Sequence, residues 1–399
     1  MAKVELSRDD FHQGFTPGSV KKTAESKLRD YKVFPTRKFV RYGAIDKSLL
    51  RVVPDKVHRF GSMNVYEGCR LLVKRGITEA NKEKGWIISR LDTDPFCFTN
   101  SIHAVRLPDL SANEAKIILG IFWSSLARYY FWLTAGSWMW HNEIHLEDIQ
   151  DMPIRLPEDA KVRDRIVRIV KKLEEKGANT ASVNICDGGT LTFEQTLQLE
   201  HDLDEAIFDL YEVNEAERDL VRDMCEYGLD LFYNNVKSEA VKPVEANRPA
   251  SNCGVLKDVP TRRDLQKGFE GYIRTFLRIW NRELEPDGEF RWQLIRPGRD
   301  IRMAGIVFST QGKGESLRAV KGSETAQWHK VLEKLDKTQP APVSKRVYID
   351  GVVRAVSDTD IMIIKRNERR LWTRSMARED AEATLLQAIH LQESRRGQV

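Results

Sequence analysis

The sequence predicts an α+β protein in which a β-rich region, a helical region and a second mixed region follow one another. Short apolar runs divided by Gly, Asp and Pro fill the first 110 residues, and apolar residues at helical spacing dominate from 111 onward. A stretch without periodicity at 237–260 precedes a new set of helix and strand patterns. Because 399 residues exceed what one hydrophobic core usually supports, we expect several domains. The expected parts are a β-rich domain at 1–110, a helical scaffold at 111–236, a linker at 237–260 and a small α+β domain at 261–399.

The β-rich region begins with an arm, residues 1–20, for which the sequence predicts no regular structure. Extended runs follow it, and Gly, Asp and Pro residues separate them. They are "YKVFPTRKFVRY" (31–42), "LLRVV" (49–53), "RLLVKRGI" (70–77), "GWIISRL" (85–91) and "FCFTNSIHAVRL" (96–107). Together they predict a small twisted sheet, mixed or antiparallel.

The helical region begins at Ser111, an N-cap residue with Glu114 at the capping-box position. The apolar stretch 117–140, broken by Ser, Arg and Gly, predicts a buried, aromatic-rich helix pair. An extended segment at 141–157 is then expected. Three helices should follow at 158–177, 192–212 and 214–235, the last with Asn214 and Glu217 as a second capping box.

The last region combines an amphipathic helix, several strands and a closing helix. The helix covers "DLQKGFEGYIRTFLRIWNREL" (264–284), and the closing helix covers "SMAREDAEATLLQAIHLQES" (375–394). The strand patterns are "FRWQLIRP" (290–297), "MAGIVFST" (303–310) and "RVYIDGVVRAVSDTDIMIIKR" (346–366).

Composition excludes several classes of protein. There is no run of about 18 apolar residues and no apolar segment of a signal peptide near the N-terminus, which favours a soluble, cytoplasmic chain without membrane contact. Five scattered cysteines without a Cys-x-x-Cys pair do not suggest a disulfide framework or a zinc cluster. The chain therefore depends on packed cores.

Charge is distributed unevenly along the chain. Residues 1–110 carry 21 Lys and Arg against 13 Asp and Glu, a net charge of +8. Residues 111–245 carry 14 against 26, or −12, and residues 246–399 carry 29 against 20, or +9. Surfaces that meet a polyanion are therefore expected in the two terminal regions.

Catalytic motifs are not recognisable in this sequence. The segment "STQGKGES" (309–316) lacks the spacing of a phosphate-binding loop, and we interpret it as a hairpin loop. In "HNEIH" the glutamate stands two residues after His141, whereas the zinc motif of metalloproteases places it directly after the first histidine. A strand or turn with two ordinary histidines, His141 and His145, is the simpler interpretation. "PDGEFRW" (286–292) holds its acidic residues too close together for a metal-dependent nuclease and fits a turn.

Basic residues combine with aromatic ones in the first region. Arg37, Lys38 and Arg41 surround two aromatic residues in "PTRKFVRY". A second basic group follows, made of Arg70, Lys74 and Arg75. Such side chains neutralise phosphates or donate to guanine, while aromatic rings stack on bases. The alternative, which composition leaves equally open, is a solvated sheet face over an aromatic core.

A series of motifs resembles a known family. "FPTRKFVRY", "RLLVKRGI", "FCFTNSIHAVRL", "EAKIILGIFWSSLARYYFWLTAG" and "IHLEDIQDMPIRLP" occur in the order found in the C-terminal target-recognition region of TaqI-like DNA adenine N6-methyltransferases and related restriction-modification enzymes. The resemblance covers roughly residues 30–235. The matching positions are Leu71, Leu72, Lys74, Arg75, Phe98, Asn100, Leu119, Gly120, Ser124, Leu146, Ile149 and Pro153.

This resemblance implies a domain that grips double-stranded DNA beside an adenine held by a catalytic domain. Nothing in the chain resembles the family's Asn-Pro-Pro-Tyr loop or its glycine-rich S-adenosylmethionine turn. No cofactor is therefore expected in this chain, and S-adenosylmethionine is expected on a partner if methylation is involved. Asn100 is a candidate for pairing with the edge of an adenine.

The leading hypothesis is a DNA-binding specificity subunit of a split restriction-modification or phage-defence system, not catalytic by itself. Its partner would be a methyltransferase or a nuclease-helicase subunit, docked on the aromatic helices and the acidic helices. The alternative is a protein-binding adaptor or inhibitor that keeps the recognition fold. An unrecognised nuclease is a third hypothesis.

The segment 363–385 resembles, more loosely, an extension that follows some methyltransferases of bacterial phage-defence systems. Lys365, Arg366 and Arg374, close to Trp372, are candidates for a second nucleic-acid contact. The alternative is a strand that leads through an aromatic core residue into a surface helix.

Overall fold

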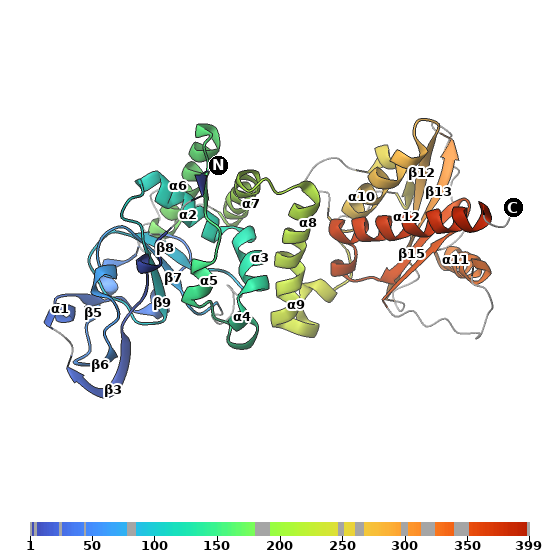
Figure 1. Ribbon diagram of the computed structural model, residues 1–399. Coiled ribbons are helices and arrows are strands. Elements are labelled where there is room, and N and C mark those ends of the chain that lie inside the picture. The colour runs from blue at the N-terminus through green and yellow to red at the C-terminus, as the bar shows by residue number, and fades with distance from the viewer. Residues whose placement is uncertain are drawn as a thin grey trace. The chain divides into compact units, whose positions relative to one another are not determined.

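The computed structural model describes residues 2–3, 6–23, 26–43, 45–77, 85–179, 192–245, 251–259, 267–296, 302–312, 324–338 and 351–396. The chain folds as two compact units, Met1–Cys225 and Glu226–Val399 (Figure 1). Both contain helices packed on sheets, so the predicted α+β class is confirmed. The finer division of the first unit into recognition and scaffold domains stays a prediction. No helix in the described ranges is long and apolar enough to span a bilayer.

A four-stranded antiparallel sheet forms the centre of the first unit, with strand order β2-β9-β7-β8. The strands are β2 (Phe11–Gln13), β9 (Ile102–Arg106), β7 (Arg70–Lys74) and β8 (Ser89–Asp92). All five residues of β7 are buried, as expected for an inner strand covered on both faces. The prediction that residues 1–20 lack regular structure was wrong. β2 pairs with β9, Phe11 opposite Val105, and gives the backbone of β9 a second partner.

A lobe that we call the basic lobe, residues 16–60, extends from this sheet. Its sequence carries 12 Lys and Arg against four Asp and Glu. Its elements are β3 (Thr16–Thr23), α1 (Ser26–Arg29), β4 (Lys32–Val33), η2 (Thr36–Lys38), η3 (Lys47–Leu49), β5 (Arg51–Val52) and β6 (Lys56–Arg59). β3 pairs with β6, and β4 pairs with β5. Phe34 of the lobe packs against Phe39 and Phe96, so an aromatic core anchors it to the strands.

Helices cover the opposite side of the central sheet. They are α2 (Ala112–Trp123), α3 (Ser125–Thr134), α4 (Gly136–His141), α5 (Leu146–Gln150), α6 (Ala160–Asn179), α7 (Phe193–Leu210) and α8 (Glu215–Asp223). The capping boxes predicted at Ser111 and Asn214 are confirmed. Ser124 separates α2 from α3, because its hydroxyl donates to the carbonyl of Ile121 and accepts from the amide of Ala127. α2 packs on α6 at Gly120, where a Cβ would lie 3.0 Å from Val170.

The segment 141–157, expected to be extended, is only partly so. His145 is the N-cap of α5, and its backbone amide donates to the carboxylate of Asp148 at 2.7 Å, which stabilises the first helical turn. A short strand, β10 (Arg155–Leu156), then pairs with β1 (Ala2–Lys3). Local capping therefore converts the middle of this segment into a helix.

The second unit contains a five-stranded antiparallel sheet with strand order β11-β12-β13-β15-β14. The strands are β11 (Cys253–Gly254), β12 (Gly288–Ile295), β13 (Met303–Gly312), β15 (Asp360–Arg366) and β14 (Val352–Val356). The predicted strands and flanking helices are thus present. Of the segment 309–316, interpreted as a loop, residues 309–312 continue β13, and 313–316 lie outside the described residues.

Helices lie on both faces of this sheet (Figure 1). α10 (Gly268–Leu284) and α12 (Arg374–Arg396) enclose a core that includes Phe276, Phe308 and Trp372. α11 (Glu324–Thr338), which the sequence pattern had not suggested, packs Trp328 and Val331 on the other face.

The remaining short elements of both units lie outside the two sheets. η5 (Met224–Gly228), a π-helical turn, crosses the boundary between the units and leads into α9 (Leu229–Asn234). The described parts of the expected linker 237–260 hold the short turns η7 (Glu239–Val241) and η8 (Leu256–Asp258), as well as β11. In the second unit, η6 (Asn235–Lys237) joins α9 to η7, and η10 (Arg369–Leu371) precedes α12. In the first unit, η1 (Arg8–Asp10) precedes β2, and η4 (Met63–Val65) precedes β7.

Candidate nucleic-acid interface

A groove of about 540 Å³ lies where the basic lobe meets one end of the central sheet. Five of the predicted DNA-contacting residues line it, although they come from three separate segments of sequence. The basic and amide side chains along it are Arg37, Lys38, Arg51, Lys74, Arg75 and Asn100. We call this feature the basic groove. The fold therefore collects residues that the sequence could only mark as candidates.

Backbone contacts between strands hold the two sides of the basic groove together. The amide of Phe34 donates to the carbonyl of Cys97 at 2.9 Å, and the hydroxyls of Thr36 and Thr99 lie 3.1 Å apart. The amide of Asn100 donates to the carbonyl of Phe15 at 2.8 Å. These bonds fix η2 beside the turn that precedes β9, so that Arg37 and Asn100 face the same space.

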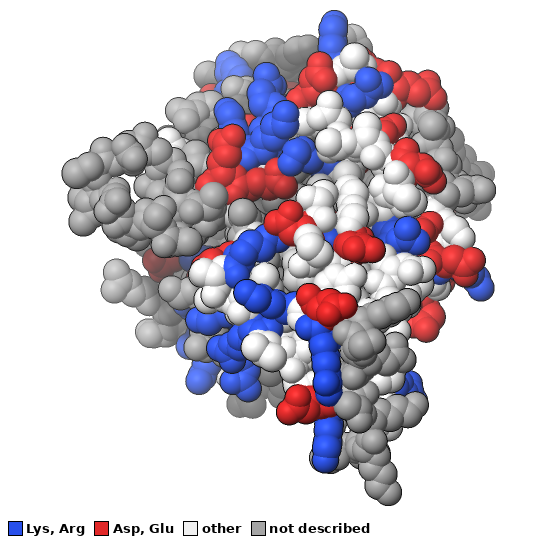
Figure 2. All heavy atoms as spheres, turned by 90° about the vertical axis from the view of Figure 1, so that its left-hand side faces the viewer, with Lys and Arg blue, Asp and Glu red and all other residues white. Residues whose placement is uncertain are grey.

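The outer rim of the groove carries exposed cations. Arg37, Lys38 and Arg51 are all exposed, and no ion pair within the described ranges involves any of them. Lys74 lies deeper, 7% exposed at the end of β7. Figure 2 shows Lys and Arg side chains gathered in the lower part of the face it presents, where the basic lobe lies. Exposed cations of this kind attract polyanions.

One acidic residue, Glu143, also lines the basic groove. Its carboxylate lies 2.7 Å from the guanidinium of Arg75. The two side chains are 31% and 28% exposed, so the ion pair is accessible to solvent. Arg75 is therefore neutralised in this structure, unlike the cations of the rim.

Arg41 does not line the basic groove. It is 5% exposed, pairs with Glu200 of α7 at 2.9 Å and donates to the carbonyl of Trp123 at 3.0 Å. Its guanidinium also stacks on Trp86, 3.4 Å from the ring centroid. This placement corrects the expectation that Arg41 is available to a phosphate, because its donors already hold the lobe to the helices.

Arg70 is likewise part of the interior. It is fully buried and donates to the carbonyls of Gly68 at 2.9 Å and Asp94 at 2.7 Å. Burial lowers the pKa of its guanidinium, and the ring of Phe96 lies beneath it at 4.7 Å. These contacts close the loops at the start of β7, which corrects the expected role of Arg70 at the DNA surface.

The candidates in the second unit have different environments. Lys365 is fully buried, forms an ion pair with Asp380 and donates to the carbonyl of Leu371 at 3.2 Å. Burial lowers the pKa of Lys365, against the opposing effect of Asp380. Lys365 therefore belongs to the core, which corrects its predicted nucleic-acid contact. Arg366, with a side chain 54% exposed, and the half-buried Arg374 stay predictions.

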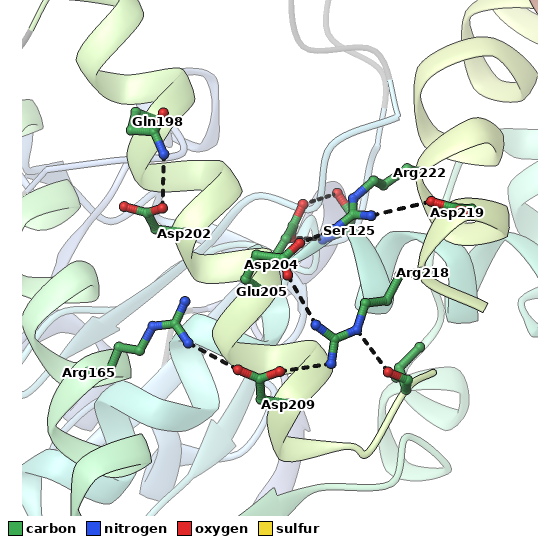
Figure 3. Close-up of polar contacts among 11 residues, drawn as sticks. Ser125, Arg165, Gln198, Asp202, Asp204, Glu205, Asp209, Arg218, Asp219 and Arg222 are labelled. Carbon is green, nitrogen blue, oxygen red and sulfur yellow. Dashed lines mark hydrogen bonds and ion pairs between the residues drawn. The ribbon is translucent and has the colours of Figure 1, made fainter. Parts of the chain in front are cut away.

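The acidic helix α7 is engaged with arginines of its neighbours (Figure 3). Glu205 accepts from Arg218 at 3.0 Å and from Arg222, both in α8. Asp209 accepts from Arg218 at 2.7 Å and from Arg165 of α6 at 3.0 Å. The acidic face, predicted to dock a partner, thus stabilises the packing of three helices.

The two histidines of "HNEIH" belong to different helices. His141 ends α4 and His145 caps α5, so the two do not share a helix face. Within the described part of the chain, no group of three or more His, Cys, Asp or Glu side chains could hold a metal ion.

Two residues of the groove escaped prediction from the sequence. Arg51 is a single basic residue in a short apolar run, a pattern common on any exposed strand. Glu143 stands in "HNEIH", where the histidines drew attention to zinc. Its position follows from a bridge between Gly76 and Glu143. The two residues are 67 positions apart, so no local sequence pattern predicts this contact.

Comparisons with known proteins include a weak structural likeness. No protein-family model matches the sequence, and no curated protein matches it. Among solved structures, the type IIL restriction-modification enzyme MmeI in complex with DNA is similar over 53% of this chain and 33% of that chain, with 14% identity and a TM-score of 0.32. The chain thus spans about a third of the length of that enzyme.

Proposed function

We propose that the first unit binds double-stranded DNA through the basic groove. The observation that carries this proposal is the convergence of Arg37, Lys38 and Arg51, exposed and without ion pairs in the described ranges, beside Asn100. Binding phosphates releases counterions from DNA, and cations on an open rim supply this attraction at little desolvation cost. The groove is therefore suited to a nucleic-acid backbone.

The polar groups of the groove divide into two roles. Arg37, Lys38 and Arg51 neutralise phosphates and position the duplex, which carries no sequence information by itself. Asn100 is the candidate for reading a base, because a side-chain amide can donate to and accept from the edge of adenine. Its backbone is fixed by the bond to Phe15, so the side chain starts from a defined position.

The wider role that we propose is target recognition within a restriction-modification or phage-defence assembly. The order of motifs over roughly residues 30–235 supports it. In this proposal a methyltransferase or nuclease-helicase partner holds S-adenosylmethionine or the nuclease site, and the present chain supplies the contact with DNA.

The test is the salt dependence of DNA binding by the full chain. We expect Arg37→Ala/Lys38→Ala to reduce the slope of log affinity against log salt by about two, since each lost phosphate contact removes roughly 0.9. Fluorescence anisotropy of a labelled mixed-sequence duplex over a salt series measures it. Lys171→Ala/Lys172→Ala is the matched control, because these lysines are also adjacent and exposed but lie on α6.

An equal loss of slope in both double variants would mean that net charge alone matters and that the groove has no special role. Absence of binding to any duplex at low salt would reject the proposal and favour the adaptor hypothesis. Cleavage of DNA by the purified chain with Mg²⁺ would instead identify a nuclease.

A further inference from the structure

We propose that Glu143 is a selectivity residue of the basic groove, which keeps Arg75 neutralised until a duplex replaces its carboxylate. This inference rests on the proposed function, since it concerns how the same groove chooses among polyanions. Glu143 is the one acidic side chain among the described residues that line this groove. A carboxylate among phosphate-binding cations weakens attraction to any anion, so its presence calls for a physical reason.

The backbone around Glu143 is held firmly against the end of β7. The amide of Ile77 donates to the carbonyl of Asn142 at 2.8 Å, and the amide of Ile144 donates to the carbonyl of Arg75 at 2.9 Å. The carbonyl of Ile144 also lies 3.0 Å from the ring nitrogen of buried His103. Asn142 itself adopts a left-handed conformation with φ of 54°, which a residue other than glycine rarely does. Glu143 is thus directed into the groove by a constrained turn.

The guanidinium of Arg75 is only partly satisfied by this ion pair. One terminal nitrogen contacts Glu143 at 2.7 Å, while Nε is buried without a hydrogen-bond partner in the described part of the chain. A guanidinium presents five N–H donors in a planar fork, and the fork suits phosphate as well as carboxylate. Because the side chain is 28% exposed, an incoming oxygen acceptor can reach the guanidinium of Arg75 at its terminal nitrogens, not at the buried Nε.

Replacing the carboxylate of Glu143 by a phosphate as the partner of Arg75 costs little free energy. An ion pair in which both side chains are about one-third exposed contributes little to stability, because solvent screens it. A duplex aligned by Arg37, Lys38 and Arg51 can bring a phosphate to Arg75 and displace Glu143. A flexible polyanion without that alignment gains less from the exchange and still meets the negative charge of Glu143.

The experiment compares Glu143→Gln with the unaltered chain on two ligands, a labelled mixed-sequence duplex and inorganic polyphosphate as competitor. Gln has nearly the same shape but no charge. We expect polyphosphate to bind about threefold to tenfold more tightly, and the salt slope of duplex binding to stay unchanged because the duplex already contacts Arg75 in the unaltered chain. Glu175→Gln, an exposed glutamate on α6, is the matched control and should change neither value.

The second comparison places Glu143→Gln in an Arg75→Ala background. If Glu143 acts through Arg75, the gain for polyphosphate disappears there. A gain that persists without Arg75 would overturn the exchange mechanism and leave a simple field effect. Weaker binding by Glu143→Gln would also overturn it, because Glu143 would then only position Arg75.

These outcomes are separate from failure of the proposed function. If the unaltered chain binds no duplex at low salt, the DNA proposal itself fails. If it binds duplex through Arg37 and Lys38 while Glu143→Gln equals the unaltered chain on both ligands, only the selectivity role of Glu143 fails.

Discussion

Replacing Arg41 by Ala separates a structural role from a DNA contact. Arg41 pairs with Glu200 at 2.9 Å, and in an effective dielectric of about 20 this distance corresponds to a gross attraction of about 6 kcal/mol. Desolvation of both groups offsets much of it, and removal of one partner of a buried pair typically costs 3–5 kcal/mol. The side chain of Glu200 is 17% exposed and keeps a hydrogen bond from Tyr42 at 2.7 Å. We therefore expect a loss near the lower limit, about 3 kcal/mol.

The assay measures thermal unfolding and DNA binding on the same variants. For a unit of this size, a loss of about 3 kcal/mol lowers the melting temperature by about 6–12 °C. The salt slope of binding measured below that temperature should stay unchanged, because Arg41 does not line the groove. Arg37→Ala is the reciprocal control, and it should leave the melting temperature unchanged while the salt slope falls by about one.

The opposite result would refute a purely structural role for Arg41. A variant that melts like the unaltered chain but has lost a unit of salt slope would show that Arg41 reaches a phosphate. The pair with Glu200 would then be a resting contact, and the basic groove would extend farther along the lobe than its lining residues indicate.

Two further predictions concern the scaffold behind the groove. Burial lowers the pKa of His103 from 6.5 to about 4. As the pH falls, the histidine is therefore protonated in the unfolded chain before it is protonated in the folded one. The free energy of unfolding should fall by about 3 kcal/mol between pH 6.5 and pH 4. Urea unfolding at several pH values should show no such loss for His103→Gln, whereas His58→Gln, at an exposed site, should retain it. An equal dependence of unfolding free energy on pH in His103→Gln and the unaltered chain would contradict the assignment. Gly14→Ala should lower the free energy of unfolding by about 1–3 kcal/mol and should also weaken DNA binding. The added Cβ would lie 2.1 Å from the carbonyl oxygen of Phe98 and would displace the turn that carries Asn100. Gly136→Ala, with nothing within 4 Å of its Cβ and outside the residues that line the groove, is the control for chemical unfolding and binding, and equal effects of the two changes would disprove the steric explanation.

Local patterns predicted the secondary structure well where caps and periodicity agree. Ser111 and Asn214 begin helices as expected, since a capping box satisfies backbone amides within four residues and needs no distant partner. The prediction of an irregular arm at residues 1–20 failed because the structure there depends on a distant partner. β2 exists because β9 offers it an edge about 90 residues later in the chain, and no local pattern contains that contact.

In the candidate site, too, local patterns located basic residues but did not predict contacts between distant segments. Arg70, Leu72 and Lys74 alternate onto one face of β7, so the strand pattern alone does not separate the two cations. In the structure, Arg70 lies over Phe96 and donates to two carbonyls, whereas Lys74 reaches the groove. Which end of a strand is covered depends on loops that pack there, and their positions are set by tertiary contacts.

Charge by segment is an incomplete guide to surface potential, because ion pairs inside the fold cancel much of it. The segment 111–245 has a net charge of −12, yet Glu205 and Asp209 are occupied by arginines of α6 and α8, and Glu200 is occupied by Arg41 of the basic lobe. Arg37 and Lys38 stand outside these pairs. What a polyanion meets is therefore the charge left after pairing, and in the first unit that remainder includes the rim of the basic groove. We therefore expect a single carboxylate placed there, that of Glu143, to influence binding more than the many acidic residues of α7.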